Sequence, residues 1–414
     1  MLVPMNSSLL AGLAIFAAAC LAAAAQEART WTDTKGRTIE GSFLKQDDTT
    51  VWVKRGDGRE VAIPKKSLSA DDLKHLESAV PASPPAVGGV GAGAASAGRF
   101  NNAKIDPSVW KPKEGGFGLG KFTFATNLET EHFIIATNDK VRPAMLTAYA
   151  DSSERLWSDM AADMPELGEA FGGKKLLVVL AEKAGATSFS AWHDKHADES
   201  SSVARHYRLA DAGIASFSLD DKFADEAGLT IAGRLFRLDS KNAEHNRRNW
   251  PQRIHFLSGD ILTQVTGRPD DNDDFNLSLV KLAYSYHREE LVCGRIESEV
   301  SFGGGGEVEG FKNGRNWPGA TKKLLKAGAR PDIKGFLGVH ASKAEPRDLG
   351  FGLGLMRYIH VDPARLAGFG KMLATARTDD KCPDPEAFAK ALGLDSAAAL
   401  DAAWRDYMLS DAFQ

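Results

Sequence analysis

The sequence predicts an α+β protein with more than one folded domain: a small β-rich module, a linker and a larger second domain. The chain of 414 residues is long enough to bury more than one core, and 43% hydrophobic with 26% charged residues is ordinary for a folded protein. Apolar and polar residues alternate between residues 39 and 63, which is the period of β-strands. Residues 79–98 are almost wholly Ala, Gly, Pro, Ser and Val, a composition typical of a flexible linker.

The N-terminus carries an apolar run dense in Ala and Leu over residues 7–25, which ends in Ala23-Ala24-Ala25-Gln26. Such a run before an A-x-A site is typical of a secretory signal peptide, here residues 1–25. It is short and Ala-rich for a membrane-spanning helix. We therefore expect an exported protein, periplasmic or secreted. Lipidation of Cys20 is the alternative to simple cleavage, and membrane contact is expected only in that case.

Residues 29–78 have the pattern of a β-meander closed by one helical turn. Gly56-Asp57-Gly58 supplies the positive φ angles that a tight hairpin needs. Ser69-Ala70-Asp71-Asp72 resembles a helix capping box, and the helix that follows would bury Leu73 and Leu76. A module of this size and pattern is expected to form a small SH3-like barrel. The alternating apolar positions are Ile39, Gly41, Phe43, Val51, Val53, Val61 and Ile63.

Four short stretches of this module also carry a family likeness: Arg29-Thr30-Trp31-Thr32-Asp33, Gly36-Arg37, Val61-Ala62-Ile63-Pro64 and Leu68-Ser69. With them the module resembles the Sla homology domain of the first type, named after a yeast endocytic adaptor and found in many secreted bacterial proteins. In the adaptor this domain is linked to binding short peptide signals, so the resemblance implies a protein or peptide ligand. Trp31 and Trp52 are the candidate peptide-binding residues, because they could form an aromatic platform. The alternative is that both rings only cover a small core.

Residues 99–127 are expected to form an extended lead-in segment. Within it, Gly115-Gly116-Phe117-Gly118-Leu119-Gly120-Lys121 fits the phosphate-binding pattern G-x-x-x-x-G-K, but Phe122 replaces the Ser or Thr that would hold magnesium. We therefore expect a flexible loop here.

Residues 252–267 are the most informative part of the second domain, because they contain His255-Phe256-Leu257-Ser258-Gly259. This stretch resembles the active-site helix of gluzincin peptidases. In that helix the motif H-E-x-x-H supplies two zinc-binding His residues and a Glu that activates the metal-bound water. Phe256 stands at the position of the base and cannot take a proton, and Gly259 stands at the second His and cannot bind a metal. The resemblance implies a zincin-like pseudo-peptidase domain over residues 128–414.

The flanking sequence resembles secreted bacterial gluzincin-like domains in the order of its elements. That order implies an opening strand at Glu131-His132-Phe133-Ile134-Ile135, a long helix over residues 141–160 and a buried strand over residues 175–180. The C-terminal part is expected to be helical, with counterparts at residues 324–328 and in a last helix that contains Trp404.

In the family, a helix after the zinc-binding motif carries the third ligand in an E-G-x-A pattern. The matching helix here reads His287-Arg288-Glu289-Glu290, which makes Glu289 the corresponding position. Taken alone, Glu289 and Glu290 beside Arg288 favour a charged helix face rather than a site.

Other candidate sites are weaker. His193 and His196 have a spacing that suits a metal on a helix, with His206 ten residues further on, but the charged residues around them favour a solvated segment. Cys293 and Cys382 remain after removal of the signal peptide. The sequence leaves open whether they form a disulfide or are buried separately.

Together these patterns favour an exported binding or scaffolding protein over an enzyme. We expect no catalytic residue, no metal and no cofactor, with His255, Phe256, Gly259 and Glu289 as vestigial metal-site positions. The formal charge of −4 gives no electrostatic basis for binding nucleic acid. Two alternatives stay open: a divergent hydrolase, using a metal site built from the His residues above or a mechanism without metal, and a purely structural envelope protein.

Overall fold

The computed structural model describes residues 29–34, 36–46, 50–55, 59–69, 71–73, 98–114, 116–119, 121–124, 126–137, 140–196, 216–219, 223, 230–239, 250–267, 275–296 and 317–414. The predicted signal peptide, residues 79–97 of the predicted linker, the predicted turn at residues 56–58 and His206 lie outside these ranges. The chain divides into two units, Met1–Ala86 and Val87–Gln414, each described by itself below. Within the described ranges, no helix has the length and apolar composition needed to cross a membrane.

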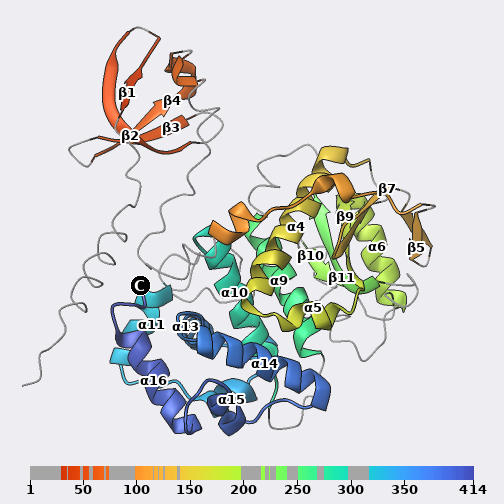
Figure 1. The fold of residues 1–414 in the computed structure, drawn as a ribbon, viewed down its shortest axis with the longest axis vertical. Helices are drawn as coiled ribbons and strands as arrows, with labels where there is room; N and C mark the ends of the chain where they lie inside the picture. Colours follow the sequence, from red (N-terminus) through yellow and green to blue (C-terminus); the bar gives the residue numbers. More distant parts are fainter. Residues whose placement is uncertain are drawn as a thin grey trace, which may run out of the picture. The chain divides into compact units, whose positions relative to one another are not determined.

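The first unit is a four-stranded antiparallel meander in the order β1-β2-β3-β4 (Figure 1). The alternation of residues 39–63 is therefore confirmed as strands, and β1 adds one that this pattern did not assign. A buried cluster of Trp31, Val51, Val53 and Leu68 forms the core. The elements are β1 (Arg29–Thr32), β2 (Thr38–Gln46), β3 (Thr50–Lys54), β4 (Glu60–Pro64) and the 3-10 turn η1 (Lys65–Ser67).

The predicted cap at Ser69 is confirmed, with the difference that the Asp72 carboxylate binds β1 instead of the backbone N–H of Ser69. Ser69 Oγ accepts a hydrogen bond from Asp72 N at 3.2 Å, as in a capping box. The buried Asp72 carboxylate accepts hydrogen bonds from Thr32 N at 2.7 Å and from Arg29 Nη2 at 2.5 Å. Asp72 therefore ties the start of the helical turn to β1. Leu73 packs against the core as predicted.

The second unit contains a five-stranded sheet in the order β10-β11-β9-β8-β7. The central strand β9 is parallel to β8 and β11, while the edge strands β7 and β10 are antiparallel. β9 reads as an unbroken apolar run because both faces of the sheet are covered. The strands are β7 (Thr126–Glu129), β8 (Phe133–Thr137), β9 (Lys175–Glu182), β10 (Ser216–Ser218) and β11 (Thr230–Leu238).

Helices pack on both faces of this sheet. Ile135, Leu176 and Val178 belong to the main core, which α4 (Pro143–Asp163), α5 (Glu166–Phe171) and α9 (Trp250–Thr266) share. The alternate residues Ile134, Leu177 and Val179 point the other way, into a smaller core with residues of α6 (Lys183–His196). The strand predicted at residues 175–180 and the helix predicted at 141–160 are confirmed as β9 and α4.

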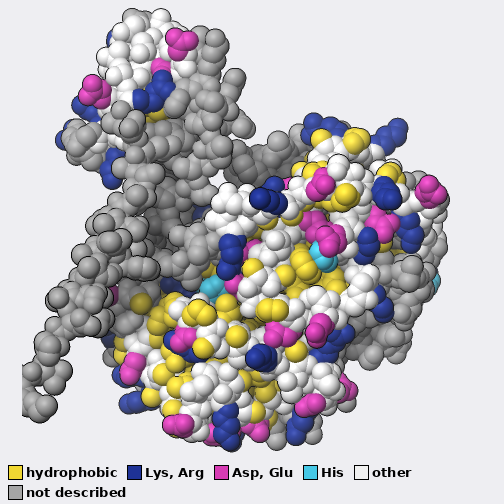
Figure 2. All heavy atoms as spheres, in the orientation of Figure 1, with side chains coloured by type: hydrophobic (Ala, Val, Ile, Leu, Met, Phe, Trp, Pro, Cys, Tyr) yellow, Lys and Arg dark blue, Asp and Glu magenta, His cyan; other side chains and the backbone are white. Residues whose placement is uncertain are grey.

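The rest of the second unit is helical, as expected, and begins with α10 (Ser278–Cys293) (Figure 1). On the face of this unit shown in Figure 2, acidic and basic side chains are interspersed with apolar ones. Glycines allow some of these helices to pack very closely. A Cβ atom at Gly354 would lie 2.3 Å from Met408 Sδ, and one at Gly368 would lie 1.8 Å from Ala391 O. The remaining helices are α11 (Trp317–Lys326), α12 (Ile333–Gly338), η6 (Ala341–Lys343), α13 (Pro346–His360), α14 (Pro363–Asp379), α15 (Pro385–Ala391) and α16 (Ala397–Leu409).

The loop predicted around residues 115–121 contains part of a hairpin instead. β5 (Phe117–Leu119) pairs with β6 (Phe122–Phe124), and Leu119, Phe122 and Phe124 are buried in the smaller core. The glycine-rich composition suggested a loop, but the three apolar side chains are enough to hold the hairpin against the sheet.

Candidate functional site

Helices α9 and α10 bring together two of the four predicted vestigial positions. His255 on α9 and Glu289 on α10 are both buried, and His255 Nδ1 lies 3.4 Å from Glu289 Oε2. His255 and Glu289 are 34 residues apart in the sequence (289 − 255) but face each other in the fold. Their imidazole and carboxylate groups are donor types that metal sites use. The Tyr286 ring lies 4.2 Å from the His255 ring, and burial, reinforced by the charge of Glu289, raises the pKa of its phenol.

Phe256, at the position of the general base, is held in place by charged neighbours. The Arg234 guanidinium from β11 lies 4.6 Å from the centre of the Phe256 ring, a cation–π arrangement. Arg234 also makes two hydrogen bonds to the Asp260 carboxylate on α9, at 2.8 and 2.9 Å. Phe256 therefore packs against the Arg234 guanidinium, which also links the sheet to α9 through Asp260.

Gly259, at the position of the second His, leaves room for a side chain only if the Ser285 hydroxyl shifts. A Cβ atom there would lie 2.8 Å from Ser285 Oγ on α10. Among the residues that the structure describes, no group of three His, Cys, Asp or Glu side chains could hold a metal ion. The described geometry therefore offers two potential metal donors, His255 and Glu289, without a third.

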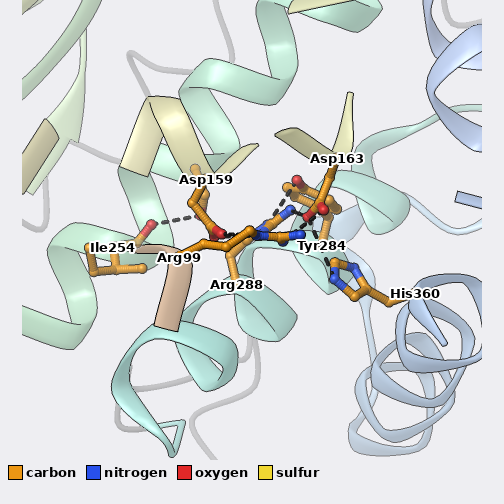
Figure 3. Close-up of polar contacts among 8 residues, drawn as sticks. Arg99, Asp159, Asp163, Ile254, Tyr284, Arg288 and His360 are labelled. Atoms are coloured by element: carbon orange, nitrogen blue, oxygen red, sulfur yellow. Dashed lines mark hydrogen bonds and ion pairs between the residues drawn. The ribbon is translucent and has the colours of Figure 1, made fainter. Parts of the chain in front are cut away.

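The prediction that Arg288, Glu289 and Glu290 form a charged helix face is wrong. Arg288 and Glu289 are fully buried. Arg288 Nη1 donates to Asp159 Oδ2 at 2.6 Å and Arg288 Nη2 donates to Asp163 Oδ2, both on α4 (Figure 3). These two carboxylates offset the free-energy cost of burying the Arg288 guanidinium, because a buried charge needs a close partner of opposite sign.

Arg99 joins the same carboxylates from the segment before the sheet. Its Nε donates to Asp159 Oδ1 at 3.0 Å and its Nη2 to Asp163 Oδ1 at 2.7 Å. Arg99, Arg288, Asp159 and Asp163 are called the ion cluster below. No pattern in the sequence predicted it. The only local signal was the four-residue spacing of Asp159 and Asp163, which places both on one face of a helix.

Two histidines lie beside the ion cluster, His287 buried and His360 with a side chain that is 6% exposed. His360 Nε2 on α13 lies 3.5 Å from Asp163 Oδ2, and the His360 and His287 rings are 5.0 Å apart, edge to face. Burial, together with nearby cations, lowers the pKa of both imidazoles. Burial opposes ionisation of Glu290, but the neighbouring His287 imidazole, 3.8 Å away, and the hydrogen-bonded Arg357 guanidinium outweigh it and lower the pKa of Glu290 to about 2.

The weaker candidates are not brought together as a site. His193 is fully buried on α6 against Phe223, with ring centres 4.8 Å apart, so the prediction of a solvated segment is wrong for this residue. His196 is exposed on the same helix, and its Nδ1 lies 2.6 Å from the Trp192 carbonyl oxygen. Cys293 and Cys382 do not form a disulfide with each other.

In the first unit the two candidate tryptophans have different environments. Trp31 is fully buried and donates its indole N–H to Gly41 O at 2.9 Å, so its ring cannot stack on a ligand. Trp52 is half-buried on β3, between the buried Val51 and Val53, so it points to the opposite face. Its cross-strand neighbours are Lys45 and the exposed Ala62. Trp52 alone remains a candidate for peptide binding.

Comparison with known proteins bears on the first unit. No curated protein and no solved structure matches the chain. Residues 21–83 match the family model described as SLA1 homology domain 1, SHD1. The resemblance predicted for the N-terminal module is therefore confirmed: this part of the chain matches the SLA1 homology domain 1 family.

Proposed function

We propose that this chain is an exported, non-catalytic binding protein in which the SHD1 module and a degenerate gluzincin-like domain both serve recognition. One observation carries the proposal. His255 and Glu289 lie 3.4 Å apart on neighbouring helices, as the gluzincin likeness requires of two ligands, while Phe256 and Gly259 pack against other elements and supply neither a base nor a further ligand. Chemistry that requires a metal-bound water has no support in this arrangement.

The order of elements supports the likeness of the second unit to gluzincins. The Glu131-His132-Phe133 sequence leads into β8, and α4 and the buried β9 follow. α9 and α10 then carry the two facing residues, and a helical region completes the unit.

A peptide ligand is the partner that the module favours. The meander presents the half-buried Trp52 ring on the outer face of a central strand, beside the small, exposed Ala62. An aromatic ring flanked by a small residue leaves room for a side chain or a peptide plane to stack. This arrangement also fits the SH3-like barrel expected for the module.

The test is to restore the missing site. We expect the unaltered protein to contain no stoichiometric zinc by mass spectrometry of metals, and to leave generic peptides uncut. The triple change Phe256→Glu, Gly259→His and Ser285→Ala should introduce zinc at about one ion per chain, because it supplies both missing groups and removes the oxygen that blocks position 259.

Two matched variants make the result specific. The double change without Ser285→Ala should bind zinc more weakly, since a Cβ at position 259 lies 2.8 Å from Ser285 Oγ. Adding His255→Ala to the triple variant should remove the metal. Stoichiometric zinc in the unaltered protein that is lost on His255→Ala would instead favour the divergent hydrolase.

A further inference from the structure

Residues 98–103, called the strap below, precede β5 and lie against α4. Residues 98–102 are helical, and the Phe100 side chain is buried with its ring 5.9 Å from the Trp250 ring. Arg155 Nη1 on α4 donates to the carbonyl oxygens of Asn101 and Ala103, both at 2.9 Å. Arg99 adds the two ion pairs described above.

The strap completes the charge balance of the ion cluster. Asp159 and Asp163 each accept hydrogen bonds from both Arg288 and Arg99, so two carboxylates face two guanidiniums (Figure 3). Arg288 is fully buried and belongs to α10, whereas the Arg99 side chain is 39% exposed. If the strap lifted, one guanidinium would remain for two buried carboxylates, leaving an uncompensated negative charge.

His360 is the group placed to take over that charge. Its Nε2 lies 3.5 Å from Asp163 Oδ2. The groups that face it are Asp163 from α4, His287 and Arg288 from α10, and Arg99 from the strap. Glu290 and Arg357 compensate each other beside His287, and Glu290 keeps its charge down to a pH of about 2. While the strap is in place, burial and the neighbouring cations lower the pKa of His360.

We propose that Arg99 of the strap and a proton on His360 are alternative counter-charges for the Asp159–Asp163 pair, so that acidification favours release of the strap. Docking of the strap lowers the proton affinity of His360. By linkage, protonation of His360 weakens docking of the strap by the same factor. If strap release returns the pKa of His360 to near its ordinary value of 6.5, docking weakens as the pH falls through that value, by up to about tenfold for each unit by which docking had lowered it. The strap is the first described segment after the predicted linker, so its release would change the length of chain that joins the two units. This inference does not depend on the proposed function.

The decisive measurement is the titration of His360 by NMR in the full chain, with His360→Gln used to assign its signal. We expect the pKa of His360 to rise by at least one unit in Arg99→Gln. It should also rise in Arg155→Gln, which removes the strap's carbonyl contacts but leaves every charge of the ion cluster in place. Arg347→Gln is the matched control, because Arg347 is exposed at the far end of α13 and pairs with Glu345. A His360 pKa in both test variants equal to that of Arg347→Gln would overturn the proposal.

A second readout follows the strap itself. Amide hydrogen exchange in residues 98–103, corrected for the intrinsic effect of pH, should accelerate between pH 7 and pH 5 in the unaltered protein. In His360→Gln it should not, since no proton can be gained there. Circular dichroism at both pH values distinguishes strap release from general unfolding. Equal acceleration in the two proteins, with the fold intact, would show that another group drives the change.

Discussion

At positions 256 and 259, where the gluzincin motif has a base and a metal ligand, Phe256 and Gly259 are engaged in packing. Phe256 lies under the Arg234 guanidinium, which is paired with Asp260, and Gly259 lets α9 approach Ser285. A substitution at either position therefore disturbs neighbours on another element. The identity of each of these two side chains is linked to the packing between elements.

The two tryptophans of the module give a prediction at this scale. Trp31→Ala should unfold the module, because loss of a large buried ring costs about 3–5 kcal/mol and small domains have little more to lose. Trp52→Ala should leave the module folded and weaken peptide binding. Hydrogen exchange in residues 29–54 of the full chain measures folding, and an array of immobilised extended peptides measures binding. Full binding by a folded Trp52→Ala protein would remove Trp52 from the recognition surface.

Among the elements, α13 and α14 show how glycine inside a helix can stabilise a fold. Glycine lowers intrinsic helix stability by about 1 kcal/mol relative to alanine. Here it permits approaches that any side chain would prevent, against Met408 at Gly354 and against the Ala391 carbonyl at Gly368. Close packing between helices outweighs the local preference.

Gly368→Ala should therefore destabilise the second unit by about 1–3 kcal/mol, the usual cost of overpacking, despite the better helix propensity of alanine. Gly168→Ala on α5 is the matched control. It is exposed with nothing within 4 Å of a new Cβ, so it should be neutral or stabilising by up to about 1 kcal/mol. Urea unfolding curves of the two variants test the contrast, and equal stabilities would contradict the close-packing argument.

Elements with a local, periodic signal could be predicted from the sequence. The alternation in β2–β4, the cap at Ser69 and the run that forms β9 are of this kind. The ion cluster could not be predicted, because Arg288 meets Asp159 and Asp163 from 129 and 125 residues away. A run of charged residues is normally exposed, and only distant partners make burial of Arg288 and Glu289 possible. The pairing of His255 with Glu289 was implied by the gluzincin likeness rather than by any local pattern.

On the scale of the whole molecule, the second unit includes more of the chain than the predicted domain at residues 128–414. Phe100, Arg99 and the β5–β6 hairpin all pack within it, ahead of that boundary. A fragment that begins at residue 128 would lose these side chains and part of β7, whereas one that begins at residue 98 keeps them.

Limited proteolysis tests this division. Because residues 79–97 contain no pattern able to bury surface, we expect the first cut there, with release of two folded fragments. Mass spectrometry should find the larger fragment starting at or before residue 98. A stable fragment that starts near residue 128 would contradict the role given to the strap, and an uncut linker would contradict the separation of the units.

Helix α10 has a broader consequence. Residues 283–289 are seven consecutive buried positions, about two full turns, so the helix is enclosed on every side. Its neighbours come from both halves of the unit: α4 and α9 precede it in the chain, and α13 and α14 follow it. Neither half can cover this helix without the other. A gene split after α10 would therefore yield two pieces that recover the fold only by complementing each other.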